Sequence, residues 1–135
     1  MDVVVLVVVQ AVDVASFVTA SDASKEVFKT ATLLKTLTVN ALITGDVSVG
    51  KRSLAYYIMP SATIIDASDF NELLIALETS KEIIITNLEY SPNIKTLIDT
   101  ITLNNVRIIA TTKSSYNNEY LEDIFSVKFE IPPLN

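Results

Sequence analysis

The sequence contains no cysteine, no histidine and no tryptophan, and it has two glycines among 135 residues. Without cysteine there is no disulfide framework and no thiol nucleophile. Without histidine, the commonest general base and metal ligand is also missing. Any chemistry must therefore use Lys, Arg, Asp, Glu, Ser, Thr or Tyr side chains, and the composition predicts no metal site.

Positive charge is scarce as well. Ten Lys and Arg residues stand against 16 Asp and Glu residues, which gives a formal net charge of −6. Nucleic-acid binding depends on clustered Lys and Arg, so the composition argues against DNA binding by this chain. Half of the residues are hydrophobic and 19% are charged, which is typical of one globular domain and not of a disordered chain.

The longest apolar run lies at the start of the chain. It extends from Val3 to Val9 before Gln10 and Asp13 interrupt it, so it is far shorter than the roughly 18 residues of a membrane span. No cationic segment precedes it, and we expect a cytoplasmic protein without a transmembrane span. Residues 1–16 are predicted to form a Val-rich strand or extension. This strand either joins the sheet of the chain itself or pairs with another chain.

From residue 17 to residue 135, short apolar runs alternate with amphipathic segments. The predicted strands are Asn40–Thr44, Ala62–Ser68, Glu82–Thr86, Val106–Thr112 and Val127–Ile131. The predicted helices start at Ser21 or Asp22, at Gly50, at Asp69 (with Glu72 as a capping box), near Pro92, and near Glu119. This alternation predicts a three-layer α/β domain with a mostly parallel, five-stranded sheet.

Both glycines fall in one short stretch, "GDVSVGK", which ends at Lys51. The pattern G-x-x-x-x-G-K between a strand and a helix is the phosphate-binding loop, in which backbone N–H groups surround phosphate oxygens and the lysine reaches the β- and γ-phosphates. The alternative is an ordinary strand-to-helix turn. The predicted nucleotide-binding residues are Gly45, Asp46, Val47, Ser48, Val49, Gly50, Lys51, Arg52 and Ser53.

Several segments together resemble the AAA+ domain of sigma-54-dependent transcriptional activators, from about Phe17 to Leu134. They are, in order, "ASDASKEVFKTATLL", "NALITGDVSVGKRSLAYYI", "ATIIDASDF", "VRIIATTK" (sensor I) and "FEIPPL". The resemblance implies a three-layer P-loop NTPase core that binds ATP or ADP, assembles side by side into rings and regulates transcription.

The chain departs from that family at the positions that carry chemistry. The Walker B strand of the family ends in Asp-Glu, which organise magnesium and polarise the attacking water. Here the aligned residues are Thr86 and Asn87, and Glu89 is a weak candidate for the missing acid. Thr112 and Lys113 stand at the sensor I position, where the family has Asn.

Further departures affect magnesium, the arginine finger and the partner-binding segments. Arg52 follows the loop lysine at a position where P-loop proteins usually have Ser or Thr as a magnesium ligand. The family that the chain resembles typically has Glu there, so Arg52 departs from both patterns and a magnesium requirement is doubtful. The segment before "PPL" contains no arginine, and Asp69–Lys81 leaves no room for the sigma-contacting GAFTGA loop. We also expect the domain to lack the helical lid and the DNA-binding helix-turn-helix.

Three hypotheses follow. The first is a degenerate AAA+-like domain that binds ATP or ADP and acts through protein–protein contacts, by self-association or by docking into a larger assembly, with little or no hydrolysis. The second is a weak ATPase that regulates transcription and uses Glu89 or a partner's residue. The third is a structural component whose phosphate loop is a relic.

The remaining polar residues have simpler interpretations. Asp66, at a strand end, is either a ligand-binding residue or a helix cap. Tyr56 and Tyr57 are interpreted as surface and core residues of a helix, and Arg107 as an ion-paired or solvated strand residue. The acids Glu119, Glu122 and Asp123 are interpreted as an exposed helix face.

Overall fold

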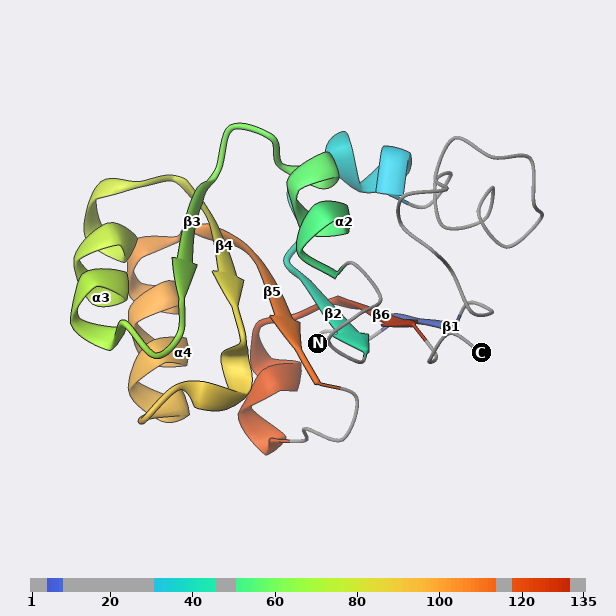
Figure 1. The fold of residues 1–135 in the computed structure, drawn as a ribbon. Helices are drawn as coiled ribbons and strands as arrows, with labels where there is room; N and C mark the ends of the chain where they lie inside the picture. Colours follow the sequence, from blue (N-terminus) through green and yellow to red (C-terminus); the bar gives the residue numbers. More distant parts are fainter. Residues whose placement is uncertain (1–4, 9–30, 46–50, 114–117, 132–135) are drawn as a thin grey trace.

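The computed structural model describes residues 5–8, 31–45, 51–113 and 118–131. Within these residues, six parallel strands form one sheet in the order β1-β6-β2-β5-β4-β3 (Figure 1). The strands are β1 (Val5–Val8), β2 (Ala41–Gly45), β3 (Thr63–Asp66), β4 (Glu82–Thr86), β5 (Arg107–Thr112) and β6 (Val127–Ile131).

Three α-helices connect successive strands, and two short 3₁₀ segments lie between other elements. They are α2 (Lys51–Ile58), α3 (Phe70–Thr79), α4 (Ile94–Asn104), η3 (Leu88–Tyr90) and η4 (Glu119–Asp123). Residues 31–35 are also helical. The predicted α/β fold class is therefore confirmed: β2 to β6 are the five predicted strands, and β1 extends the same sheet as a sixth strand at its edge, beside β6.

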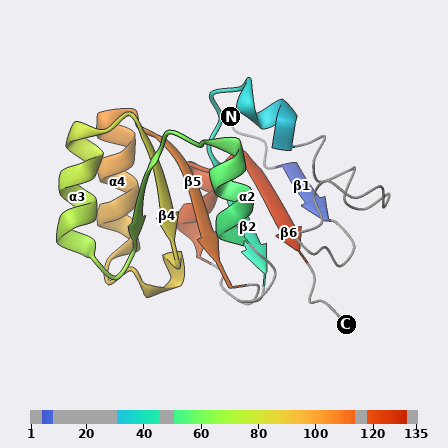
Figure 2. The same cartoon turned by 45° about the horizontal axis from the view of Figure 1, so that its top comes forward.

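The sheet is covered on both faces, which makes three layers. In β4, Ile84 packs in one cluster with Leu54 of α2, whereas Ile83 and Ile85 pack in a second cluster with α3 and α4. Figure 2 shows α3 and α4 beside one another on their face and α2 apart from them. Successive side chains of a strand point to opposite faces, so a continuous apolar strand has to be buried on both sides. The uninterrupted isoleucines of β4 meet this condition.

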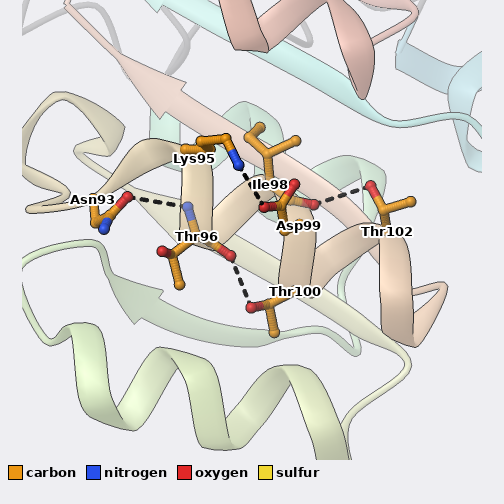
Figure 3. Close-up of polar contacts among 7 residues, drawn as sticks. All are labelled: Asn93, Lys95, Thr96, Ile98, Asp99, Thr100 and Thr102. Atoms are coloured by element: carbon orange, nitrogen blue, oxygen red, sulfur yellow. Dashed lines mark hydrogen bonds and ion pairs between the residues drawn. The ribbon is translucent and has the colours of Figure 1, made fainter.

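The α4 helix illustrates how the sequence defines an outer element. Asn93 caps its start, because the Asn93 Oδ1 atom accepts a hydrogen bond of 3.1 Å from the Thr96 backbone N–H. On the exposed side, Lys95 pairs with Asp99 at 3.3 Å, one turn along the helix (Figure 3). Three apolar residues of α4, Leu97, Ile98 and Ile101, are buried against the sheet, whereas Leu103 near the end of the helix is 84% exposed.

Two local predictions about helices require correction. The Asp69 side chain makes no capping hydrogen bond at the start of α3, so the predicted capping box is wrong. The segment predicted as a short helix near Glu119 is a 3₁₀ segment, η4, whose acidic side chains are exposed. Residues 21–30 of the first predicted helix lie outside the described residues. In the described part, Ala31 and Leu34 are buried.

At the amino ends of the strands, Arg107 and Asn40 join several elements. The Arg107 guanidinium donates to the carbonyl oxygens of Leu34 and Val39 and forms an ion pair of 3.4 Å with Glu82. Asn40 accepts from the Ile108 backbone N–H at 2.8 Å. The predicted ion-paired role of Arg107 is confirmed.

None of the helices that the structure describes has the length and apolar character needed to cross a membrane.

Candidate functional site

The predicted site residues gather at one edge of the sheet. Because the strands are parallel, their carboxyl ends meet at the same edge, where open α/β sheets bind ligands. This edge carries Gly45 at the end of β2, Asp66 at the end of β3, Thr86 at the end of β4 and Thr112 at the end of β5. We refer to it as the carboxyl edge.

The loop lysine is the first residue of α2. Lys51 is 8% exposed, and its Nζ atom donates a hydrogen bond to the backbone carbonyl oxygen of Gly45. The ammonium group is therefore held against the last residue of β2, at the point where the chain enters the predicted phosphate loop. Asp46 to Gly50, the centre of that loop, lie outside the described residues.

The residues after Lys51 face outward on α2. Arg52 and Ser53 are exposed and, with Tyr56 and Ile64, line an open cavity of about 400 Å³. Tyr56 is half exposed, whereas the Tyr57 hydroxyl lies 3.0 Å from Thr32 Oγ1. Arg52 thus follows the buried Lys51 in the first turn of α2, and its own side chain is exposed.

The two Walker B positions bind a carboxylate from the neighbouring strand. Thr86 Oγ1 donates to Asp66 Oδ2 at 3.2 Å, and Asn87 Nδ2 donates to the same oxygen at 2.7 Å. The second oxygen of Asp66, Oδ1, accepts from the Ser68 backbone N–H at 2.9 Å and from Ser68 Oγ at 2.7 Å. The carboxylate beside the predicted Walker B residues is therefore Asp66, which ends β3, and not a residue of β4.

These contacts determine the charge state of Asp66. Burial raises the pKa of the Asp66 carboxyl, but hydrogen bonds from Ser68, Asn87 and Thr86 act in the opposite direction and lower the pKa below its ordinary value. Each of these donors favours the ionised carboxylate. Asp66 is consequently a carboxylate at neutral pH. The helix-cap interpretation of Asp66 does not apply to α3, whose N-cap is Asp69.

Glu89 and Asn87 connect β4 to β5. Asn87 has a left-handed backbone, with φ of 54°, and its N–H donates to Thr111 Oγ1 at 3.2 Å. Asparagine tolerates this conformation better than most residues. In the turn that follows, Glu89 Oε1 accepts from the Lys113 backbone N–H at 3.2 Å. Glu89 therefore holds the end of β5, the predicted sensor I segment.

Thr112 supplies a polar atom that the described residues leave unsatisfied. It is fully buried, its Oγ1 atom has no hydrogen-bond partner there, and its strand position pairs with Thr44, one residue before Gly45. A buried hydroxyl without a partner is costly unless a ligand or water bonds it. Thr112 alternates with Ile108 and Ala110, which pack with α3 and α4, so its side chain lies on the face of the sheet opposite to α2 and Lys51. Lys51 is therefore the residue of this edge whose charge fits a phosphate-bearing ligand.

Magnesium, which the AAA+ pattern implies, does not fit the same residues. Thr86 and Asn87 carry no charge and donate to Asp66. Asp66 itself lies three strands from β2, in the order β2-β5-β4-β3, which is about 14 Å at the usual spacing between strands. In the part of the chain that the structure describes, no group of three Asp or Glu residues could hold a metal ion.

Comparison with known proteins adds a fold assignment. No family model and no curated protein matches the sequence. A solved structure that is similar is that of PCH-2 from C. elegans, an AAA+ ATPase, with a TM-score of 0.54 and 15% sequence identity. The match covers 83% of this chain and 43% of the PCH-2 chain. The chain has an AAA+-like P-loop NTPase core fold.

The AAA+-like core explains why the residues of the predicted site lie together, since β2, β4 and β5 are adjacent and parallel. The sequence predicts Lys51, Thr86, Asn87 and Thr112 as residues of this edge and leaves the role of Asp66 open. The contact of Asp66 with Asn87 depends on the pairing of β3 with β4. The signal in the sequence for a role of Asp66 at this edge is its place as the last residue of a strand.

Proposed function

We propose that this AAA+-like domain binds ATP or ADP at the loop between β2 and α2 and acts through protein–protein contacts, with little or no hydrolysis. The observation that carries the proposal is the position of Lys51, which is buried at the start of α2 and bonded to the Gly45 carbonyl oxygen at the carboxyl edge. The N-terminus of α2 adds partial positive charge at the same place.

The side chains at the predicted Walker B positions support the proposal that the domain hydrolyses little or no ATP. Thr86 and Asn87 cannot act as a metal-organising acid or as a base. Glu89, the weak candidate for the missing acid, already accepts a hydrogen bond from the Lys113 backbone. The arginines of the whole chain are Arg52 and Arg107, and Arg107 is held at the opposite edge by Glu82. These contacts favour a binding domain over the alternative of a weak ATPase.

We further propose a relation to the sigma-54-dependent activators, because the similar segments occur in the same order from Phe17 to Leu134. On this view the domain has lost the sigma-contacting loop and retains a role in regulation or assembly. Its partners would be other proteins, among them further copies of the chain.

Isothermal titration calorimetry with ATP and with ADP tests nucleotide binding. We expect saturable binding to the full chain and a loss of affinity of about tenfold or more in Lys51→Met, because a charge-assisted hydrogen bond is worth about 1.5–3 kcal/mol. Methionine keeps the length of the buried side chain. The matched control is Lys81→Met, which removes a lysine beside β4 at the amino end of the strands and should bind as the unmodified chain does.

Phosphate release measured on the same proteins tests the absence of hydrolysis. The unmodified chain and Lys51→Met should release phosphate at the same background rate. Titrations without heat, confirmed by equilibrium dialysis, would contradict nucleotide binding. A rate that falls to background in Lys51→Met would instead favour the weak ATPase.

A further inference from the structure

The residues at the end of β4 act as hydrogen-bond donors and not as metal ligands. Thr86 and Asn87 both donate to Asp66 Oδ2, at 3.2 Å and 2.7 Å. The left-handed backbone of Asn87 and the bond from its N–H to Thr111 hold the amide in place. Thr86 and Asn87, which stand where an acid would reach a metal ion, therefore bond Asp66 instead.

Asp66 has no remaining capacity for a metal ion. A carboxylate offers about four lone-pair sites. In Asp66 these sites accept from Ser68 N–H, Ser68 Oγ, Thr86 and Asn87. Mg²⁺ requires nearly ideal octahedral geometry and is bound by one or two carboxylates together with substrate phosphates. Binding of magnesium by Asp66 would therefore break hydrogen bonds that already satisfy it.

The charges nearest to the loop favour an anion and oppose a cation. Lys51 and Arg52 are adjacent at the start of α2, and the partial positive charge of the helix N-terminus lies at the same place. A guanidinium matches phosphate geometry through paired N–H groups. Arg52 also stands where P-loop proteins have the hydroxyl that ligates magnesium. Positive protein groups thus take the place that the metal ion has in other sites.

We infer that this site selects nucleotide without magnesium: its ligand is uncomplexed ATP or ADP, whose phosphates are neutralised by Lys51, Arg52 and the N-terminus of α2. The inference rests on the proposed function, because it specifies which form of the nucleotide binds. Magnesium then acts as a competitor, since it removes the free nucleotide from solution and adds positive charge to the ligand. The occupancy of the site would depend on the ratio of nucleotide to magnesium.

Calorimetric titration of the full chain with ATP, once in excess EDTA and once in excess Mg²⁺, tests this inference. We expect the apparent Kd in excess magnesium to be weaker than the Kd in EDTA, because magnesium removes the uncomplexed nucleotide. A Kd that is equal or tighter in magnesium overturns the inference and leaves the proposed function standing. An absence of binding in both buffers overturns the proposed function and this inference with it.

Two variants separate the role of Arg52 from general charge. Arg52→Gln should weaken binding of ATP in EDTA by about tenfold, the loss expected for one charge-assisted contact. Arg107→Gln, an arginine removed at the amino end of the strands, should not weaken it in samples shown by circular dichroism to be folded. Equal affinities of Arg52→Gln and the unmodified chain would contradict the role given to Arg52.

Paramagnetic Mn²⁺ gives a readout that does not depend on affinity. In the protein saturated with ATP, added Mn²⁺ should leave the backbone amide NMR signals of Thr86 and Asn87 sharp. Selective broadening of these two signals would place a metal ion beside them and overturn the inference. Broadening is expected in Thr86→Asp, which restores an acid at the end of β4, if the variant binds the ATP–metal complex.

Discussion

Two hydroxyls, one amide and one backbone N–H converge on the Asp66 carboxylate. Their combined effect outweighs burial, which raises the pKa, and leaves the pKa of Asp66 below its ordinary value of 3.8. The folded chain consequently binds a proton at Asp66 less readily than the unfolded chain does. A single residue therefore links the stability of the β3 and β4 ends to pH.

The pH dependence of unfolding tests this link. Since the folded-state pKa of Asp66 is lowered, its contribution to stability is fully present above 3.8 and is lost as the pH falls through the lower folded-state value. The difference in free energy of unfolding between the unmodified chain and Asp66→Asn should be largest at neutral pH and shrink below pH 3.8. Urea unfolding at a series of pH values measures it.

Asp99→Asn is the matched control for that series, because Asp99 is an exposed carboxylate that pairs with Lys95. It should change the free energy of unfolding by a few tenths of a kcal/mol, about the value of an exposed ion pair. A difference between the unmodified chain and Asp66→Asn that stays constant with pH would mean that the hydrogen bonds do not favour the ionised carboxylate.

At the scale of elements, α3 and α4 begin in different ways, although each follows a residue type that commonly caps helices. Asn93 accepts from the Thr96 N–H at the start of α4. The side chain of Asp69 makes no such bond at the start of α3. Instead, the Asp69 N–H donates to the Asp66 carbonyl oxygen at 3.0 Å, which places Asp69 in the turn that leaves β3. Similar sequence signals thus have different structural outcomes.

Replacement of both residues measures this difference. Asn93→Ala should lower the free energy of unfolding by about 1 kcal/mol, the usual value of an N-cap hydrogen bond. Asp69→Ala should lower it by much less, because no side-chain bond is lost. Chemical denaturation of the two variants gives the comparison directly. Equal losses in both would show that Asp69 caps α3 in solution.

The strands and helices can be predicted from the sequence because apolar residues are consecutive in a buried strand and recur every three or four residues in an amphipathic helix. The apolar run Glu82–Thr86 and the spacing of Ile94, Leu97 and Ile101 define a buried strand and an amphipathic helix, and both are present as predicted. The contacts between elements were not predictable in the same way. The bond between Asn87 and Asp66 needs the register of β3 against β4, and the place of β1 beside β6 needs a register that a run of valines does not specify.

At the scale of the whole molecule, the two ends of the strands carry different contacts. The carboxyl edge holds Lys51, which donates to the Gly45 carbonyl oxygen, and the Asp66 carboxylate with its four hydrogen bonds. The amino end is joined by Arg107, which bonds the helix of residues 31–35 through the Leu34 carbonyl oxygen and bonds β4 through Glu82. Substitutions of Arg107 should therefore change stability without removing a contact at the carboxyl edge.

Arg107→Met tests the structural role of the amino end. It leaves the Leu34 and Val39 carbonyl oxygens and the Glu82 carboxylate without their arginine partner, so we expect a loss of about 2 kcal/mol in the free energy of unfolding. Lys95→Met removes an exposed ion pair and should cost less than about 0.5 kcal/mol. Thermal and urea unfolding compare the two. A similar small loss in both would show that Arg107 does not join these elements in solution.

The position of β2 between β5 and β6 has a consequence for the order of synthesis. Among the strands that the structure describes, β2 pairs with those of residues 107–112 and 127–131 and with none that precedes it in the chain. A ribosome-bound chain that ends before residue 107 holds β2 without either neighbour, while β3 and β4 can already pair. Pairing over such long separations slows folding. β2 is therefore translated early and completes its pairing only after β5 and β6 have been made.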